Sequence, residues 1–394
     1  TGPGLARALG PLLRDPALGP LRAASVVDAA TGGTVFGSDA AAAAVPASTV
    51  KLATGAAALS ALGPGHRIAT AVVGGESGQI VLVGGGDPTL TARPATGPDQ
   101  PASLRDLADR AARALAARGV RRVRLAYDTS LYSGPVLHPI GPNENLAPVV
   151  PLMADEGRLD GSDHGPADRA KDPAADAARA FADLLRERGV DVAGDPGQTA
   201  APRGAGRLAA VWSPPLSALV ERMLTTSDND IAEALARQTA LASGRPASFD
   251  GAAQAVTARL AALRLPVGGA RVADGSGLDR ADRVSAALLS QVLLRAASPG
   301  HPELRPVLTG LPVAGFTGTL RGRYGQDAAY AAGRGLVRAK TGTLTGVNTL
   351  AGTVVDADGR LLVFAFMTND TTDAQGAQHA LDRLASTLAE CGCR

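Results

Sequence analysis

The sequence is poor in aromatic residues and net charge, and it contains no long apolar run. Aromatic residues make up 3% of the 394 positions, which leaves little material for stacking surfaces that bind single strands or sugars. Thirty-nine basic residues against 37 acidic ones give a net charge of +2, so we expect no nucleic-acid partner and no anionic membrane surface. No apolar run reaches the roughly 18–20 residues that span a bilayer. We therefore expect no transmembrane segment.

Cysteine and histidine are too few and too scattered to indicate metal chemistry. Cys391 and Cys393 stand one residue apart near the C-terminus, with no histidine or second cysteine pair to complete a zinc site. They can be free thiols, a strained local disulfide or an intermolecular one. The five histidines show neither ligand spacing nor a Ser-His-Asp arrangement. Residues 84–86 are all glycine but lead into Asp-Pro, unlike a phosphate-binding loop. We expect no metal and no cofactor.

Lysine is the scarcest charged residue. It occurs at only three positions, Lys51, Lys171 and Lys340, and all other basic residues are arginine. Arginine stays protonated in proteins, whereas a lysine removed from water can lose its proton. A sequence with this bias should keep lysine chiefly where arginine cannot replace it. Two of the three lysines lie in the motifs described below.

Strand-like and helical patterns predict an α/β (α+β) fold. Two strand-like runs near the N-terminus flank a glycine turn, three more close the chain, and helical patterns lie between. This arrangement predicts one five-stranded antiparallel sheet covered by helices, built from residues 1–68 and 207–394. The five runs are 23–28, 34–36, 336–341, 348–355 and 360–367.

Residues 69–206 read as an insertion with its own sheet. The amphipathic helix at 103–118 is followed by a glycine and a strand, and the same helix, glycine and strand recur at 174–192. Irregular stretches rich in proline, glycine and aspartate lie at 133–173 and 194–206. We predict an inserted α/β domain of unknown accessory role, formed as one module or two.

Three short motifs carry the chemistry of the sequence. Ser48 stands three residues before Lys51 at the start of an alanine-rich helix, so the amine can take the hydroxyl proton. The helix N-terminus also supplies N–H donors near a developing oxyanion. Ser227–Asn229 follows between two helical stretches, and Lys340–Gly342 ends a strand-like run. Each motif alone is weak, because such spacings and turns are common.

Together, and in this order, the motifs are those of serine β-lactamases and penicillin-binding proteins. The chain resembles the class C low-molecular-mass penicillin-binding proteins, D-alanyl-D-alanine carboxypeptidases/endopeptidases with a large insertion between the first two motifs. The resemblance covers nearly the whole chain and implies a β-lactamase/transpeptidase-like domain. At Asp279 the family more often has serine, a departure that touches no catalytic residue. Three further stretches are similar to that family: 84–90, 274–278 and 318–320.

The resemblance implies a role for each catalytic residue. Ser48 would attack the penultimate D-Ala carbonyl and form an acyl-enzyme, with Lys51 as the general base. Ser227 would relay a proton to the leaving amine with help from Lys340. Asn229 would hold either the peptide backbone or the Lys51 amine. Which lysine acts as base in each step stays open.

Other positions are expected to bind substrate. Lys340 and Thr341 would bind the terminal carboxylate, and Gly342 would let substrate approach the strand closely. The Thr343 N–H, with that of Ser48, would form the oxyanion hole. Asp128, at the end of a predicted strand, is either a contact for an amine on the peptide side chain or a strand-end turn residue.

A second stretch imitates the third motif. Residues 316–320 read Phe-Thr-Gly-Thr-Leu and 340–344 read Lys-Thr-Gly-Thr-Leu. Phenylalanine stands where the cation must be, so we expect 316–320 to form a structural loop near the site.

Two other functions share these motifs. A serine β-lactamase must deacylate quickly, with a glutamate or tyrosine that activates water. No Glu-x-x-Leu-Asn segment lies between Lys51 and Ser227, and the second motif begins with serine rather than tyrosine. A penicillin-binding sensor that acylates without turnover would show a receptor-like transmembrane segment.

The expected partners follow from this chemistry. They are peptidoglycan peptides ending in D-Ala-D-Ala, with β-lactams as covalent inhibitors. Such peptides occur outside the cytoplasmic membrane, so we expect an extracytoplasmic protein of the cell envelope, periplasmic or secreted. The oligomeric state, the balance of carboxypeptidase and endopeptidase activity, and the stem-peptide side-chain preference stay open.

Overall fold

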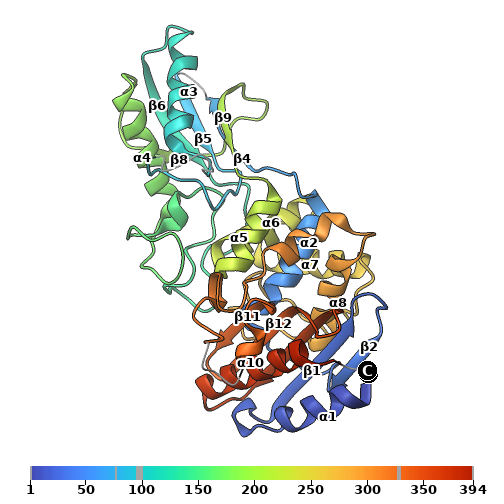
Figure 1. The fold of residues 1–394 in the computed structure, drawn as a ribbon. Coiled ribbons are helices and arrows are strands. Elements are labelled where there is room, and N and C mark those ends of the chain that lie inside the picture. Colours follow the sequence, from blue (N-terminus) through green and yellow to red (C-terminus); the bar gives the residue numbers. More distant parts are fainter. Residues whose placement is uncertain (1, 76–77, 95–100, 326–329, 393–394) are drawn as a thin grey trace. The chain divides into compact units, whose positions relative to one another are not determined.

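The computed structural model of the protein describes residues 2–75, 78–94, 101–325 and 330–392, which fall into two compact units (Figure 1). The first unit comprises Thr1–Pro64, Ser217–Arg245 and Phe249–Arg394. The second comprises Gly65–Leu216 with Pro246–Ser248. The second unit is therefore largely one long insertion into the chain of the first.

A five-stranded antiparallel sheet forms the centre of the first unit, as predicted. The strand β1 (Leu21–Asp28) pairs with β13 (Leu361–Asn369) along its whole length and so joins the two ends of the chain. The sheet order is β11-β12-β13-β1-β2. The other three strands are β2 (Thr34–Ser38), β11 (Arg338–Leu344) and β12 (Val347–Val355).

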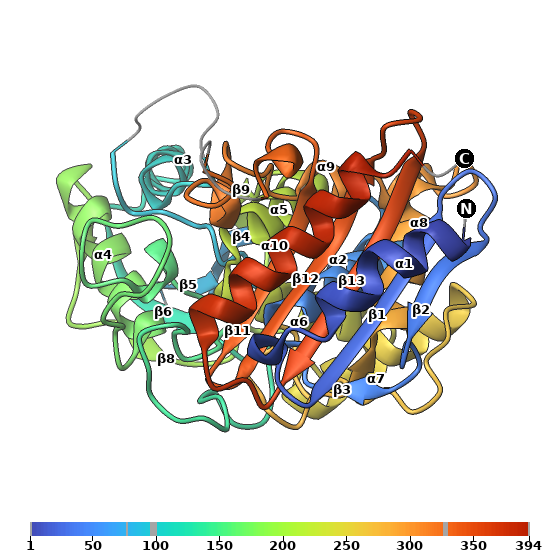
Figure 2. The ribbon, with the colours of Figure 1, turned by 60° about the horizontal axis from the view of Figure 1, so that its bottom comes forward.

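The two faces of this sheet meet different helices. Helices α1 (Gly2–Leu13) and α10 (Ala374–Glu390) lie across one face (Figure 2). Their core includes Ala24 and Val26 of β1. Ser25, between these two, faces the other way and hydrogen-bonds Ser290 of α8 (Ala286–Ala297) at 2.8 Å. Successive side chains of β1 thus point to opposite faces of the sheet, one covered by α1 and α10 and the other by α8.

Helix α2 (Lys51–Leu62) is buried and packs against α8 and two further helices. Besides α8, it contacts α6 (Asn229–Ala242) and α7 (Phe249–Ala262). Its first nine residues are all buried, and most are small. A lysine at the start of such a helix loses its water shell. The remaining elements of this part are α5 (Leu216–Thr226), α9 (Pro306–Thr309) and the paired short strands β3 (Ala43–Ala44) and β10 (Val284–Ser285).

The second unit has a mixed sheet with the order β7-β6-β5-β4-β9, and β8 also pairs with β6. Helices α3 (Leu104–Ala116) and α4 (Pro173–Glu187) pack their buried apolar residues into the same core as the sheet. Each helix is followed by a glycine in the left-handed region, Gly119 and Gly189, and then by a strand. The strands are β4 (Ala69–Gly74), β5 (Gln79–Val83), β6 (Arg122–Asp128), β7 (Asp191–Val192), β8 (Gly197–Gln198) and β9 (Arg207–Trp212).

The edges of the insertion differ from the predicted boundaries at 68/69 and 206/207. The compact units divide after Pro64 and after Leu216. The second difference arises because β9, which was not predicted, pairs antiparallel with β4 from Ala69 opposite Trp212 onward. Residues 207–212 therefore belong to the sheet of the second unit.

Two further findings concern membrane-crossing helices and the two cysteines. Among the described residues, no helix combines the length and apolar character needed to cross a membrane. Cys391 is disulfide-bonded, and Cys393 lies outside the described residues.

Candidate active site

Ser48 lies in a tight turn rather than inside an α-helix. The turn Ala47–Val50 is a 3-10 helix that leads directly into α2. Ala47 has a φ of 48°, a left-handed conformation that a residue with a Cβ rarely adopts. The Pro46 carbonyl accepts hydrogen bonds from the hydroxyls of Thr49, at 2.7 Å, and Thr349, at 2.8 Å. These bonds fix the serine turn to the central sheet through β12.

Two glycines let the backbone close around this turn. A Cβ on Gly342 would lie 2.1 Å from Thr349 Oγ1 and 2.6 Å from the Pro46 carbonyl oxygen. A Cβ on Gly277, whose φ is 84°, would lie 2.0 Å from the Ala47 carbonyl oxygen. The motif predicts that Gly342 lets substrate approach the strand closely. In the structure, the serine turn itself already leaves no room for a side chain at this position.

Lys51 is fully buried and directed at Ser48. Its Nζ lies 2.9 Å from Ser48 Oγ, 2.7 Å from Asn229 Oδ1 and 2.7 Å from the Ser276 carbonyl oxygen. Asn229 was predicted to contact either the peptide backbone of the substrate or the Lys51 amine, and the structure shows the contact with the Lys51 amine. The carbonyl of Ser276 was not predicted, because a backbone atom leaves no trace in a motif.

The surroundings of Lys51 bring its pKa toward neutrality. Burial lowers the pKa from 10.5 to about 8, against the opposing pull of Asp274, Asp228, Glu233 and Asp282, in that order. A lysine with this pKa is partly neutral near pH 7–8 and can accept a proton.

The second motif places three successive residues in three conformations. Ser227 has a φ of 61°, in the left-handed region. Asp228 caps α6, where its carboxylate accepts the Ile231 N–H at 3.0 Å. Asn229 is the first residue of α6. The turn lets Ser227 and Asn229 reach two different lysines.

Lys340 is the second buried lysine. Its Nζ donates to Ser227 Oγ at 2.9 Å and to the Thr341 carbonyl at 2.8 Å. Burial first, and then the nearby Lys51 cation, hold the pKa of Lys340 well below its usual value. Among the described residues, the charged neighbour that acts on Lys340 is thus another cation.

The loop that imitates the third motif lies beside the true one, as expected. Thr341 Oγ1 donates to Thr319 Oγ1 at 2.8 Å. A Cβ on Gly318 would lie 2.1 Å from the Thr225 carbonyl oxygen, so this loop packs closely against the end of α5. Thr343, further along β11, is exposed.

Asp128 stands apart from the other predicted residues, since it lies in the second unit at the end of β6. Its carboxylate accepts the backbone N–H of Ser130 and of Ala201, each at 2.7 Å. Burial alone would raise the pKa of Asp128, but these hydrogen bonds outweigh it and lower the pKa. The strand-end role is therefore present, and amine binding stays a prediction.

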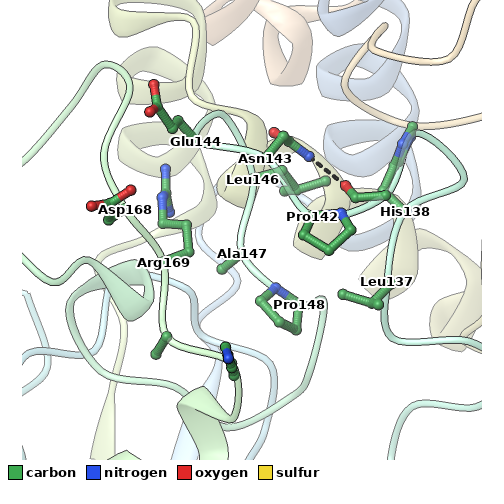
Figure 3. A pocket seen from close by; sticks show the side chains of 13 residues that line it. Leu137, His138, Pro142, Asn143, Glu144, Leu146, Ala147, Pro148, Asp168 and Arg169 are labelled. Atoms are coloured by element: carbon green, nitrogen blue, oxygen red, sulfur yellow. Dashed lines mark hydrogen bonds between the residues drawn. The ribbon is translucent and has the colours of Figure 1, made fainter.

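The second unit also contains a hollow of about 540 Å³ (Figure 3). Apolar side chains such as Leu137, Leu146 and Pro148 line it together with the charged residues Glu144 and Asp168. None of the residues predicted as catalytic or substrate-binding lines this hollow.

Known proteins resemble this chain over nearly its whole length. The family model of D-Ala-D-Ala carboxypeptidase 3 (S13) matches residues 5–162 and 161–388. A carboxypeptidase DacB of Mycolicibacterium smegmatis is 40% identical over 99% of this chain and 85% of its own length. A carboxypeptidase of Mycobacterium tuberculosis is 39% identical over 99% of this chain and 84% of its own.

Solved structures show the same fold. Penicillin-binding protein 4 of Haemophilus influenzae superposes with a TM-score of 0.80 at 23% identity, covering 98% of this chain and 99% of that one. The same protein has been solved in complex with a β-lactam, with a TM-score of 0.72 at 24% identity, covering 96% of this chain and 97% of that one. With the family model and two relatives matched over nearly its whole length, this chain belongs to the D-Ala-D-Ala carboxypeptidase 3 (S13) family.

Proposed function

We propose that this chain hydrolyses peptidoglycan stem peptides ending in D-Ala-D-Ala, through an acyl-enzyme on Ser48. The observation that carries the proposal is the contact of 2.9 Å between Ser48 Oγ and the buried Lys51 Nζ. A serine hydroxyl is a weak nucleophile until a nearby base takes its proton. Family membership supplies the substrate class.

The acylation step uses first the Ser48–Lys51 pair and then the Ser227–Lys340 pair. Ser48 Oγ attacks the carbonyl carbon of the penultimate D-Ala while its proton passes to Lys51 Nζ. The backbone N–H groups of Ser48 and Thr343 stabilise the oxyanion, an effect for which losing one donor typically costs about 10²–10³ in rate. The C–N bond then breaks, and the leaving D-alanine nitrogen takes a proton from the Ser227 hydroxyl, which Lys340 replenishes. Water later hydrolyses the ester and frees the enzyme.

The third motif recognises the peptide C-terminus. Lys340 is a buried amine whose charged neighbour is another cation, Lys51. A substrate carboxylate bound here supplies the missing opposite charge and raises the pKa of Lys340 again. Thr341, whose hydroxyl lies on the same strand, adds a hydrogen bond to that carboxylate. This arrangement selects peptides with a free terminal carboxylate and also the carboxylate of β-lactams.

The substrate places the protein outside the cytoplasm, in the periplasm, the cell envelope or the medium. β-Lactams are proposed as covalent inhibitors, in line with the β-lactam complex of the Haemophilus protein. Asp128 is retained as a contact for an amine on the peptide side chain, and the second unit as an accessory domain.

Intact-mass spectrometry after benzylpenicillin treatment tests the proposal. We expect a stable adduct of one drug molecule that is absent from Ser48→Ala. Fast destruction of the drug without an adduct would instead identify a β-lactamase. Release of D-alanine from a peptide ending in D-Ala-D-Ala then separates an enzyme from a sensor that acylates without turnover.

A further inference from the structure

Glu233 continues the polar face of α6 that begins with the second motif. It follows Asn229 by four residues, so both side chains lie on one face of the helix. Its carboxylate is fully buried. Arg237, four residues further on, donates to Glu233 Oε2 at 2.9 Å and lies over the Phe249 ring at 4.1 Å. Asn229 contacts Lys51 directly, whereas Glu233 reaches it through a loop.

The loop consists of residues 275–277, here called the strap. Glu233 Oε1 accepts the backbone N–H of Gly275 at 2.9 Å and of Ser276 at 3.0 Å. Asp274 Oδ1 accepts the next N–H, that of Gly277, at 2.6 Å. A Cβ on Gly275 would lie 2.7 Å from the Ala232 carbonyl oxygen, so the strap lies directly against α6.

The strap carbonyls are directed at α2. The Gly275 carbonyl accepts the Thr54 hydroxyl at 2.7 Å, and the Ser276 carbonyl accepts Lys51 Nζ at 2.7 Å. N–H and C=O groups of a trans peptide point in opposite directions. The Ser276 N–H that Glu233 holds belongs to the same peptide unit as the Gly275 carbonyl, so Glu233 directs that carbonyl to Thr54. The Gly277 N–H that Asp274 holds belongs to the same peptide unit as the Ser276 carbonyl. Glu233 therefore acts on the Ser276 carbonyl through the adjoining peptide unit of the strap.

We propose that Glu233 is a positioning residue, which holds the strap so that Ser276 and Asn229 orient the Lys51 amine toward Ser48. A neutral lysine has two N–H bonds and one lone pair. The Asn229 oxygen and the Ser276 carbonyl oxygen only accept, so each takes one N–H. The lone pair is then left facing the Ser48 hydroxyl. The inference rests on the proposed function, because it assumes that Lys51 is the base.

The strap also lies in a cluster of charges that face Lys51 from several elements. Asp274 immediately precedes the strap and Asp282 follows it. Asp228 caps α6, Glu233 lies within α6, and Lys340 lies on β11. Burial and the neighbouring Asp274 raise the pKa of Asp282 to about 9. Glu233 is one of the carboxylates whose charge favours the Lys51 ammonium and so opposes the effect of burial on its pKa.

Two substitutions separate geometry from charge. Glu233→Ala removes both the acceptor and the charge. Glu233→Gln keeps an oxygen that can accept the two strap N–H groups but removes the charge. Thr239→Val is the matched control, since Thr239 is a buried polar residue of α6 whose hydroxyl donates within the helix, to the Leu235 carbonyl at 2.8 Å.

The experiment is stopped-flow acylation by a fluorescent penicillin from pH 6 to 9, which resolves reversible binding from the first-order acylation step. For E233A we expect the acylation rate constant to fall about 10–100-fold, as misplacement of a catalytic group does, with reversible affinity within about threefold. E233Q should keep its plateau rate within about fivefold. Its rise with pH should move to lower pH, because removing an anion lowers the pKa of Lys51. T239V should match wild type.

Other outcomes overturn the inference. A merely structural Glu233 would lower the melting temperature of both variants but leave the acylation rate of folded protein and its pH profile unchanged. Should E233A fail to fold, Glu233→Asp takes its place, since it withdraws the carboxylate from the strap by one methylene but keeps the charge; an acylation rate constant equal to that of wild type then rejects the proposal. If wild type itself forms no adduct, the proposed function fails first, and the two failures are thus distinct.

Discussion

The two units both gather charged side chains, but they do so in opposite surroundings. In the first unit, Lys51 and Lys340 have no exposed surface, and hydroxyl, amide and carbonyl oxygens accept their hydrogen bonds. In the second unit, Lys171 is exposed beside the hollow, as are the carboxylates of Glu144 and Asp168. Water stabilises an exposed ammonium, whereas burial disfavours it. Scarcity of lysine pointed to three positions, and burial shows that two of them are suited to proton transfer.

The largest effect should come from exchanging these lysines for arginine. Lys51→Arg keeps the charge but cannot supply a neutral base, so we expect benzylpenicillin acylation to fall by about 10³-fold or more. Lys171→Arg, the matched change in the exposed setting, should acylate within about twofold of wild type. Acylation rates followed by intact mass measure both. An active K51R protein would remove the proposed distinction between the lysines.

A smaller loss should follow from adding one methyl group at the strap. Gly277→Ala puts a Cβ 2.0 Å from the Ala47 carbonyl oxygen, at a φ of 84°. We expect a roughly 100-fold slower acylation, because the Ser48 turn must shift, and a loss of about 1–3 kcal/mol in unfolding free energy from backbone strain. Gly161→Ala in the second unit meets no atom within 4 Å and serves as control. Equal rates for G277A and wild type would show that the turn tolerates displacement.

Whether the sequence could predict a part of this site depends on whether side-chain or backbone atoms form it. The roles proposed for Ser48, Lys51 and Lys340 depend on side chains at fixed spacings, so sequence motifs identify these residues. The Ser276 carbonyl acts through the backbone, and only folding places it at Lys51. Glu233 lay between these cases. Its four-residue spacing from Asn229 was a usable signal, but nothing in the sequence said what the face of α6 contacts.

The fold divides in a similar way. Runs of mostly apolar, strand-forming residues predicted the five-stranded sheet, because β1, β12 and β13 are long and buried along almost their whole length. Strand β9 was missed, since six residues that follow a Pro- and Gly-rich stretch carry too short a pattern. Its partner β4 lies far away in sequence, and only that pairing defines it.

Titration should change acylation by about an order of magnitude and so test the buried setting directly. The pKa of Lys51 is lowered to about 8, chiefly by burial. The neutral fraction of such an amine rises about tenfold from pH 7 to pH 9. We therefore expect the first-order acylation constant, measured at saturating β-lactam, to rise about tenfold over that range and then level off. A flat profile from pH 6 to 9 would mean that Lys51 does not supply the limiting base.

The smallest expected effect concerns Asp128, and it can break the contrast between the units. Asp128→Asn removes the charge and replaces one of the two oxygens that accept the N–H groups of Ser130 and Ala201 by an NH2 group, which cannot accept. The lowered pKa of Asp128 in the fold means that its charge stabilises the protein above the unfolded value of about 3.9. That contribution disappears as the pH falls through the lower folded value.

The melting temperature of D128N should accordingly lie a few degrees below wild type at pH 7, and the gap should close as the pH falls below about 4. Benzylpenicillin acylation should stay within about twofold, because the drug carries no side-chain amine for this carboxylate to bind. If Asp128 also binds the peptide amine, KM for an amine-bearing D-Ala-D-Ala peptide should rise about 2–12-fold, the range for losing one hydrogen bond of about 0.5–1.5 kcal/mol. KM for the same peptide with its amine acetylated should not change. An unchanged KM for both peptides would leave Asp128 as a strand-end residue with no part in binding the peptide amine.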